Sequence, residues 1–140
     1  MLECYFEEYL AELDHTLRQP SKTVAERLLD YWQDWQDNQV SFECQGKCLA
    51  VKLGAEVADL SETMRLALKR GTAGIIERLA HAIEAGIKEG SLSIESDPHS
   101  TAQSLYQLWL GASVMVKIVR TKQPFETAML TTRQVLNLST

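Results

Sequence analysis

The stretch from Leu105 to Val119 constrains the fold more than any other part of the chain, because it is apolar on almost every side. A helix that packs on a domain through one face needs only one apolar stripe, so a helix that is apolar all round must be covered from several directions. The rest of the sequence offers few helices to surround it. We therefore expect a second copy of the chain to cover part of this helix; the alternative is a buried central helix of a monomer.

The remaining segments also have the spacing of apolar residues that is typical of helices. The expected helices span residues 1–17, 23–38, 47–58, 61–89, 98–121 and 124–136, with residue 59 as an alternative start of the fourth. Gly90 follows the last apolar turn of the fourth helix, where a C-terminal cap belongs. Asp97 and Pro98 have the residue types that favour the start of the fifth. The sequence therefore predicts an all-α fold of six helices.

Length and composition indicate one domain with its own core. The chain has 140 residues, of which 45% are hydrophobic, and its formal net charge is −5. An acidic chain lacks the basic surface that proteins use to bind nucleic acid. No apolar run reaches the length of a membrane span. Cys4, Cys44 and Cys48 do not make a disulfide framework. We expect a single domain spanning residues 1–140 of a cytoplasmic protein with free thiols, with no membrane partner.

Cys48 is the residue best placed for chemistry. It lies in the first turn of the helix expected over residues 47–58, where unpaired amides carry partial positive charge, and Lys47 and Lys52 lie close in sequence. Each of these features favours the thiolate, which is the nucleophile. Such a thiol reacts with quinones and aldehydes, or with oxidants to give a sulfenic acid. The alternative is a small buried hydrophobic side chain, which is the usual state of a free cysteine.

Two further residues extend the possible thiol chemistry. Cys44 lies four residues before Cys48, and a resolving disulfide between them is possible if the geometry allows it. Lys117 interrupts an apolar run, and burying its ammonium is costly unless the amine is paired or deprotonated. The simpler interpretation of Lys117 is a buried stem with its tip in solvent.

Aromatic and methionine side chains suggest an apolar pocket between the helices, although such residues are also ordinary core. The pocket prediction rests on Trp32, Phe42, Met64, Tyr106 and Trp109. Trp35 belongs to the same aromatic group. A small apolar inducer would fit such a pocket.

The sequence does not indicate catalysis, a metal or a cofactor. It has no glycine-rich phosphate loop and no GxSxG motif. The three histidines form no ligand pair with a cysteine at the usual spacing. A thiol-dependent enzyme would need a base near Cys48, and no histidine lies close to it in the sequence.

Two stretches resemble a known family. Residues 48–65, CLAVKLGAEVADLSETMR, are followed by a long helix, and residues 105–113, LYQLWLGAS, are followed by Lys117, Arg120 and the Pro124-Phe-Glu turn. Together they resemble the C-terminal regulatory domain of TetR-family transcriptional repressors, over nearly the whole chain. The resemblance implies a homodimer that binds operator DNA through an N-terminal helix-turn-helix domain. We expect that domain to precede this chain and to be absent from it.

The resemblance also implies roles for individual residues. Cys48 matches the position of the sensing cysteine in the most similar family members. Lys117 matches a lysine that captures the oxidised sulfur in a sulfur–nitrogen bond. The last two helices of each chain would form a four-helix dimer interface. The interface residues we expect there are Leu110, Val114, Ile118, Phe125 and Met129. The expected function is that of a repressor's sensor and dimerisation domain, with an electrophile, oxidant or apolar inducer as its signal; the alternative is a helical homodimerisation module that binds a small apolar ligand without cysteine chemistry.

Overall fold

The computed structural model describes residues 2–38 and 61–138, and within these ranges the chain is helical and contains no β-strand. The helices are α1 (Leu2–Leu17), α2 (Val24–Asn38), α4 (Glu62–Glu89), α5 (Pro98–Val119) and α6 (Gln123–Val135). The all-α prediction is therefore confirmed. The helix expected over residues 47–58 lies outside the described residues, so the count of six stays a prediction.

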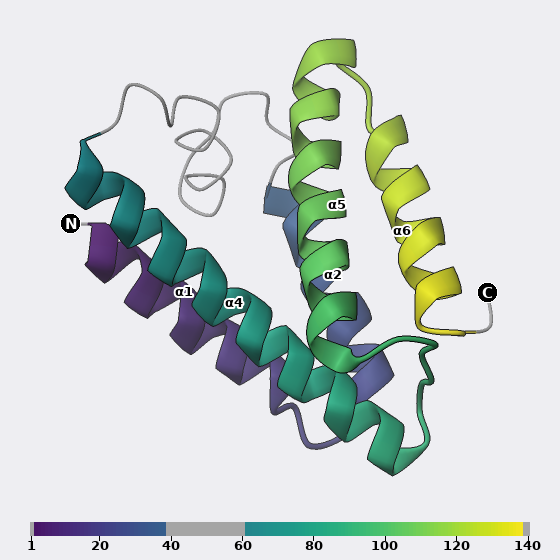
Figure 1. Ribbon diagram of the computed structural model, residues 1–140. Coiled ribbons are helices and arrows are strands. Elements are labelled where there is room, and N and C mark those ends of the chain that lie inside the picture. The colour runs from purple at the N-terminus through teal and green to yellow at the C-terminus, as the bar shows by residue number, and fades with distance from the viewer. Residues whose placement is uncertain (1, 39–60, 139–140) are drawn as a thin grey trace.

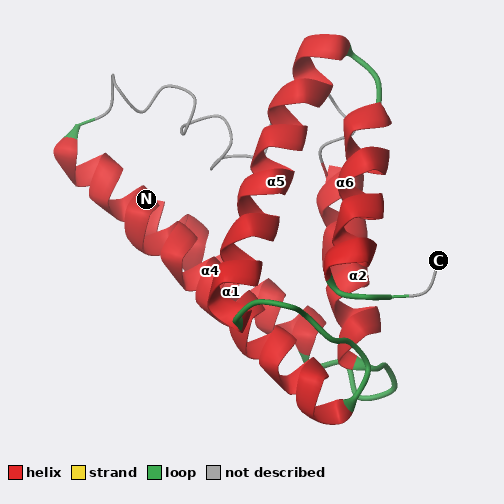
Figure 2. Ribbon diagram, turned by 45° about the vertical axis from the view of Figure 1, so that its right-hand side comes forward, coloured by secondary structure: helices red, strands yellow, loops and turns green. Residues whose placement is uncertain are grey.

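The long helix α4 contacts α1, α2 and α5. It runs alongside α1 on one side of the molecule, while α5 and α6 form an antiparallel pair on the other (Figure 1). Helix α2 contacts both α1 and α4, and α5 also packs on α4. The turned view in Figure 2 shows α5 and α6 standing apart from the α1–α4 pair at their upper ends.

The helix ends follow the residue types that the sequence provides. Ser61 caps α4 by accepting the N–H of Met64 at 3.2 Å, which identifies Ser61 as the start. Gly90 ends α4 in the left-handed conformation, with φ of 88°, which only glycine adopts without a steric cost. Asp97 caps α5 by accepting the N–H of Ser100 at 2.9 Å. These caps confirm the predicted ends of α4 and the predicted start of α5.

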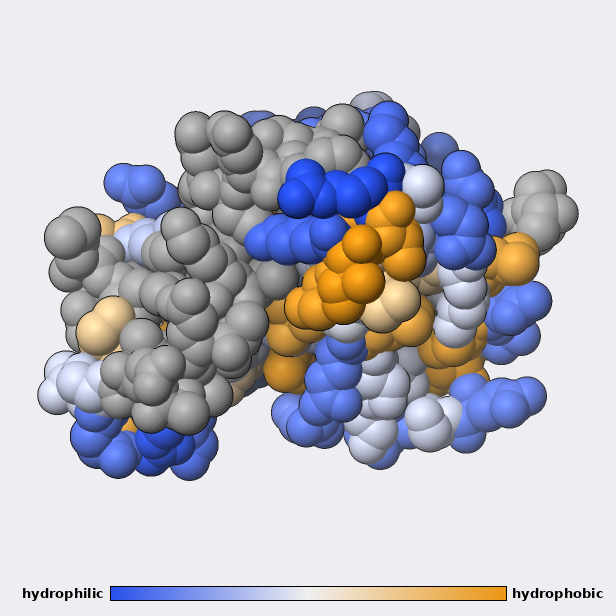
Figure 3. Space-filling model, turned by 90° about the horizontal axis from the view of Figure 1, so that it is seen from above, coloured by the Kyte–Doolittle hydropathy of each residue, from blue (hydrophilic) through white to orange (hydrophobic). Residues whose placement is uncertain are grey.

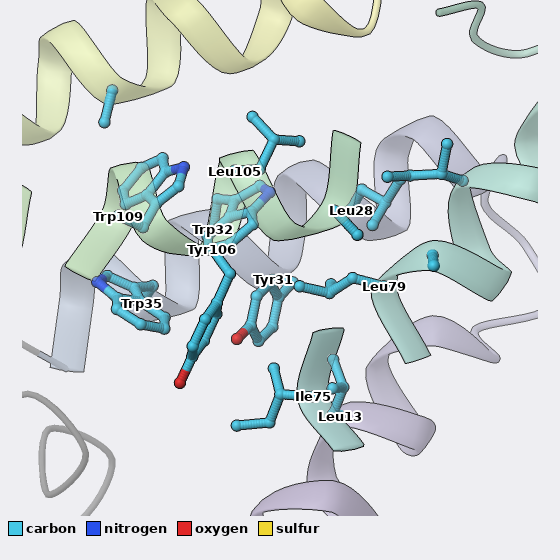
Figure 4. Packing of buried hydrophobic residues seen from close by; sticks show 14 of the residues in the cluster. Leu13, Leu28, Tyr31, Trp32, Trp35, Ile75, Leu79, Leu105, Tyr106 and Trp109 are labelled. Carbon is cyan, nitrogen blue, oxygen red and sulfur yellow. The ribbon is translucent and has the colours of Figure 1, made fainter. Parts of the chain in front are cut away.

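Three tryptophans tie α2 to α5 and α6 in the core (Figure 4). The rings of Trp32 and Trp109 stack with their centroids 4.9 Å apart and their planes at 9°. The indole N–H of Trp35 donates to Ser113 Oγ at 2.8 Å, and that of Trp109 donates to Thr132 Oγ at 2.9 Å. Each buried indole donor in these two pairs thus has a hydroxyl acceptor, which offsets the cost of removing it from water. The three helices are held together by rings and hydrogen bonds.

Helices α1 and α4 approach closely because a glycine leaves room between them. A Cβ added at Gly71 would lie 2.4 Å from ring atoms of Phe6, which is far inside van der Waals contact. An ion pair spans the same two helices, with Arg78 Nε 3.0 Å from an Asp14 carboxylate oxygen. This close packing fixes the position of α1, the helix at the N-terminal end of the chain.

Candidate functional site

The most extensive candidate site is an apolar face on α5 and α6. One side of α5 faces the core, where Leu105, Trp109 and Val116 are at most 3% exposed. The opposite side remains open, and Ile118 is 66% exposed. The exposed large hydrophobic residues of these two helices, here called the α5–α6 face, are Val114, Met115, Ile118, Val119, Leu130 and Val135. In Figure 3, which looks down on the upper end of α5, hydrophobic side chains gather in one patch beside polar ones.

The predicted interface residues divide between this face and the core. Val114 and Ile118 are exposed on the face, and Leu110 and Met129 are half-buried at the core. The interface prediction is wrong for Phe125, which is fully buried within one chain. The first turn of α6 directs its ring onto Trp109, with the centroids 5.8 Å apart. Phe125 therefore holds α6 to α5 and is not available to a partner.

The predicted thiol site is only partly within the described residues. Cys44 and Cys48 lie outside them, and Cys4 is exposed on α1. Lys117 is half-buried near the C-terminal end of α5, between buried Val116 and exposed Ile118. The assignment of Cys48 and Lys117 as a sensing pair thus stays a prediction.

Most of the predicted pocket residues pack against one another. Trp32, Tyr106 and Trp109 are at most 2% exposed, and Figure 4 shows them together in the core. Met64 is 37% exposed at the start of α4, and Phe42 lies outside the described residues. The ring edge of Tyr106 contacts Trp35, with the centroids 5.8 Å apart. Trp32, Tyr106 and Trp109 thus contribute to the stability of the core.

A small cavity lies between α1 and α2, beside this aromatic core. It has a volume of about 20 Å³, which is room for one water-sized group. Within residues 2–38 and 61–138, its walls come from α1 and α2. The lining residues are Tyr9, Glu12, Leu13, Thr16, Tyr31, Asp34 and Trp35. The cavity combines buried aromatic rings with two carboxylates near its mouth.

Two of the residues that line this cavity join their tyrosine hydroxyls in a pair. The oxygens of Tyr9 and Tyr31 lie 2.6 Å apart, and both residues are buried. Burial raises the pKa of both phenols well above the usual value, because the charged phenolate would lose its hydration there. The hydroxyl pair is therefore neutral. In Figure 4 the hydroxyls of Tyr31 and Tyr106 both point away from α6.

Sequence reasoning missed several of these groups. Ser113 and Thr132 are fully buried partners of tryptophans, and the only signal of their role is a hydroxyl residue on an otherwise apolar side of its helix. Tyr9 has the helical spacing of the other apolar residues of α1, but its pairing with Tyr31 depends on how α1 packs on α2. The spacing of residues in the sequence does not show how the two helices pack.

Residues 2–38 and 61–138 contain no candidate metal-binding group and no candidate membrane span. Within these ranges no group of three or more histidine, cysteine, aspartate or glutamate side chains is arranged to hold a metal ion. None of the helices described there is both long enough and apolar enough to cross a membrane.

The fold and the exposed face agree with a known class of protein. Residues 24–132 match the family described as the tetracyclin repressor-like C-terminal domain. The chain belongs to the TetR family of transcriptional repressors, as the C-terminal domain of that family. This confirms the resemblance seen in residues 48–65 and 105–113.

The chain is also similar to individual members of this family. The chain is 36% identical over 136 residues to the HTH-type transcriptional repressor NemR of Escherichia coli strain K12, covering 97% of this chain and 68% of that protein. The crystal structure of reduced E. coli NemR matches with a TM-score of 0.90 and 37% identity, over 97% of this chain and 70% of that one. The regulatory protein TetR of Rhodobacter sphaeroides shares the fold alone, with a TM-score of 0.85, 23% identity and coverage of 95% and 70%. These relatives are repressors and regulators, which supports a non-enzymatic role at the level of the family.

Proposed function

We propose that this chain is the sensor and dimerisation domain of a repressor that responds to electrophiles or oxidants through Cys48. The observation that carries the dimerisation half is the α5–α6 face. Its six large apolar side chains are between 36% and 66% exposed on two adjacent helices. Several large apolar side chains exposed on the same two helices are typical of an interaction site. The corresponding face of a second copy would bury it in a four-helix bundle.

The sensing half rests on sequence and on family membership. Cys48 is the first residue of the segment 48–65, which resembles the family most specifically, and the chain matches NemR over nearly its whole length. The Cys48 thiolate would attack an electrophilic carbon, forming a carbon–sulfur bond, or would be oxidised to a sulfenic acid. Lys117 would then displace water from the sulfenic acid and form a sulfur–nitrogen bond.

The connection from the thiol to DNA would run through the packed helices. Helix α2 precedes the segment that contains Cys48, and Trp32 and Trp35 hold α2 to α5. A modified Cys48 would favour a second arrangement of α4 and α5, and thereby change the separation of two DNA-binding heads. A dimeric repressor needs its half-site spacing held, so a small rotation is enough to release the operator.

Alkylation of Cys48 is expected to weaken operator binding at least tenfold. The measurement uses a full-length repressor that carries this domain behind a helix-turn-helix domain, treated with N-ethylmaleimide until mass spectrometry shows complete reaction at Cys48. The operator affinity is then compared before and after treatment at one salt concentration.

Two variants serve as controls for this experiment. Cys48→Ser is expected to bind the operator and to be insensitive to the reagent. Cys4→Ser removes an exposed thiol on α1 and is expected to leave the response intact. Unchanged operator affinity after complete modification of Cys48 would contradict the sensing proposal.

The second candidate function is a dimeric module that binds a small apolar ligand without cysteine chemistry. Tyr9, Tyr31 and Trp35, which line the small cavity between α1 and α2, are the aromatic side chains that would contact such a ligand. An ordinary Cys48 thiol, with a pKa near 8.5 and slow alkylation, would favour this function over thiol sensing.

A further inference from the structure

We propose that a basic groove where α1, α2 and α4 meet binds a small organic carboxylate. This inference goes beyond the proposed function, since it depends neither on Cys48 nor on dimerisation. Figure 1 shows the connection between α1 and α2 running beside the second half of α4. The groove there, here called the arginine groove, has a volume of about 230 Å³, which is room for several water-sized groups. Its charged and titratable lining residues are Asp14, Arg18, Arg27, Arg78 and His81.

Two of the three arginines are held in place by the chain itself. Arg27 donates from Nε to the carbonyl of Gln19 at 2.7 Å and from Nη1 to that of Leu17 at 3.1 Å. Arg78 donates from Nε to Asp14 Oδ1 at 3.0 Å. A guanidinium has five N–H donors, so each of the two keeps donors that a ligand can use. Because both are already positioned, less side-chain freedom is lost when an anion binds.

The other two basic side chains have no counter-charge in the described chain. Arg18 at the end of α1 and His81 on α4 are both exposed. Within residues 2–38 and 61–138, neither side chain forms a hydrogen bond or an ion pair. An anion in the groove would therefore meet donors from α1 and α4 that need not break an existing contact.

Positive charge exceeds negative charge at the arginine groove, although the whole chain has a formal net charge of −5. Three arginines and one aspartate line it. Glu89 lies nearby, where its carboxylate accepts the N–H of Val24 at 2.8 Å and interacts electrostatically with Arg27. Glu77 and Glu84 are exposed on α4 and do not line the groove. The lining stays positive when Glu89 is counted with it, which favours an anionic ligand.

The apolar part of the lining indicates which kind of anion. Leu17, Val24 and Ala82 line the groove together with the basic side chains, and Val24 is only 6% exposed. Guanidinium groups match the two oxygens of a carboxylate, and hydrocarbon groups contact apolar side chains. A carboxylate with a short hydrocarbon tail therefore uses both parts of the lining. The groove is open to solvent beside Ala85, which is exposed, so a longer tail can extend outward.

Titration of the unaltered chain with sodium butyrate tests this inference, with sodium acetate and sodium chloride at the same ionic strength for comparison. The Nε–H resonances of Arg27 and Arg78 report the binding in NMR spectra. We expect saturable shifts with a dissociation constant of about 5 mM for butyrate, because partly exposed charge pairs are individually weak. Acetate should bind about threefold more weakly, since it lacks two methylenes that contact the apolar side chains. Chloride should give no saturable shift.

Two pairs of variants locate the site. Ala85→Glu adds a carboxylate at an exposed position of the groove, where it competes with butyrate for the guanidinium groups, and should weaken binding at least about tenfold. Ala73→Glu adds the same charge at an exposed position of α4 outside the groove and should keep the affinity within about twofold. Arg18→Gln should weaken binding about fivefold. Its matched control is Arg65→Gln, which removes an exposed arginine at the start of α4.

The opposite results overturn the inference. Butyrate shifts that stay linear up to about 100 mM, or that equal those of chloride, would mean that the arginines only hold the helices together. Equal affinity for butyrate and acetate would contradict the role of the apolar side chains. Equal butyrate affinity in Ala85→Glu and Ala73→Glu would place carboxylate binding elsewhere. None of these outcomes involves Cys48 or the α5–α6 face, so failure here leaves the proposed function standing.

Discussion

Replacing Trp109 with alanine is expected to lower the free energy of unfolding by about 3–5 kcal/mol, the range for truncating a fully buried large aromatic side chain. Trp109 is 0% exposed and stacks between Trp32 and Phe125. Its indole N–H also bonds to Thr132 on α6. One truncation therefore removes contacts that join α2, α5 and α6. Urea denaturation at a fixed protein concentration measures the effect, since the stability of a dimer depends on concentration.

Trp109→Phe is the matched variant for this prediction. It keeps a ring between Trp32 and Phe125 but loses the hydrogen bond to Thr132, so its cost should be clearly smaller than that of alanine. A loss of less than about 1 kcal/mol for Trp109→Ala, comparable with an ordinary surface change, would show that the aromatic stack does not hold the helices together.

Replacing Ile118 with glutamate is expected to weaken self-association at least about 100-fold. Ile118 is the most exposed large hydrophobic residue of the described chain, at 66%, and lies within the α5–α6 face. In a symmetric dimer each substitution occurs twice, and burying a carboxylate in an apolar interface without a partner is costly each time. Two losses of roughly 1.5 kcal/mol already give about this factor. Analytical ultracentrifugation measures the dissociation constant.

The control for Ile118→Glu adds the same charge elsewhere. Ala73→Glu places a carboxylate at an exposed position of α4, outside the α5–α6 face, and should leave the dissociation constant within about threefold. Both variants should keep the helical content of the unaltered chain, because both positions are on the surface. Equal association by Ile118→Glu and the unaltered chain would remove the α5–α6 face as the interface.

Much of the fold could be predicted from local signals. Ser61, Gly90 and Asp97 mark helix ends through hydrogen bonds and backbone angles that depend only on neighbouring residues. Ile75 and Leu79, which share the helical spacing of apolar residues along α4, are buried in its middle. Met64 and Ile87 continue the same spacing but are exposed, because α4 has 28 residues and its ends extend beyond the shorter helices packed against it.

The candidate sites were less predictable, because they depend on which helix meets which. The all-round apolar character of residues 105–119 did indicate that part of α5 remains open in one chain, and Val114 and Ile118 are exposed there. Periodicity alone could not show that Phe125 faces α5 instead of a partner. The cavity of Tyr9 and Tyr31 needs the angle and register of α1 on α2, which no single segment encodes.

Sedimentation equilibrium of the unaltered chain, over concentrations from below one micromolar to tens of micromolar, tests the central claim most directly. Association through two copies of the α5–α6 face predicts a monomer–dimer equilibrium in which the dimer dominates at micromolar concentration. A folded chain that stays monomeric across this range would contradict the dimeric repressor domain proposed here.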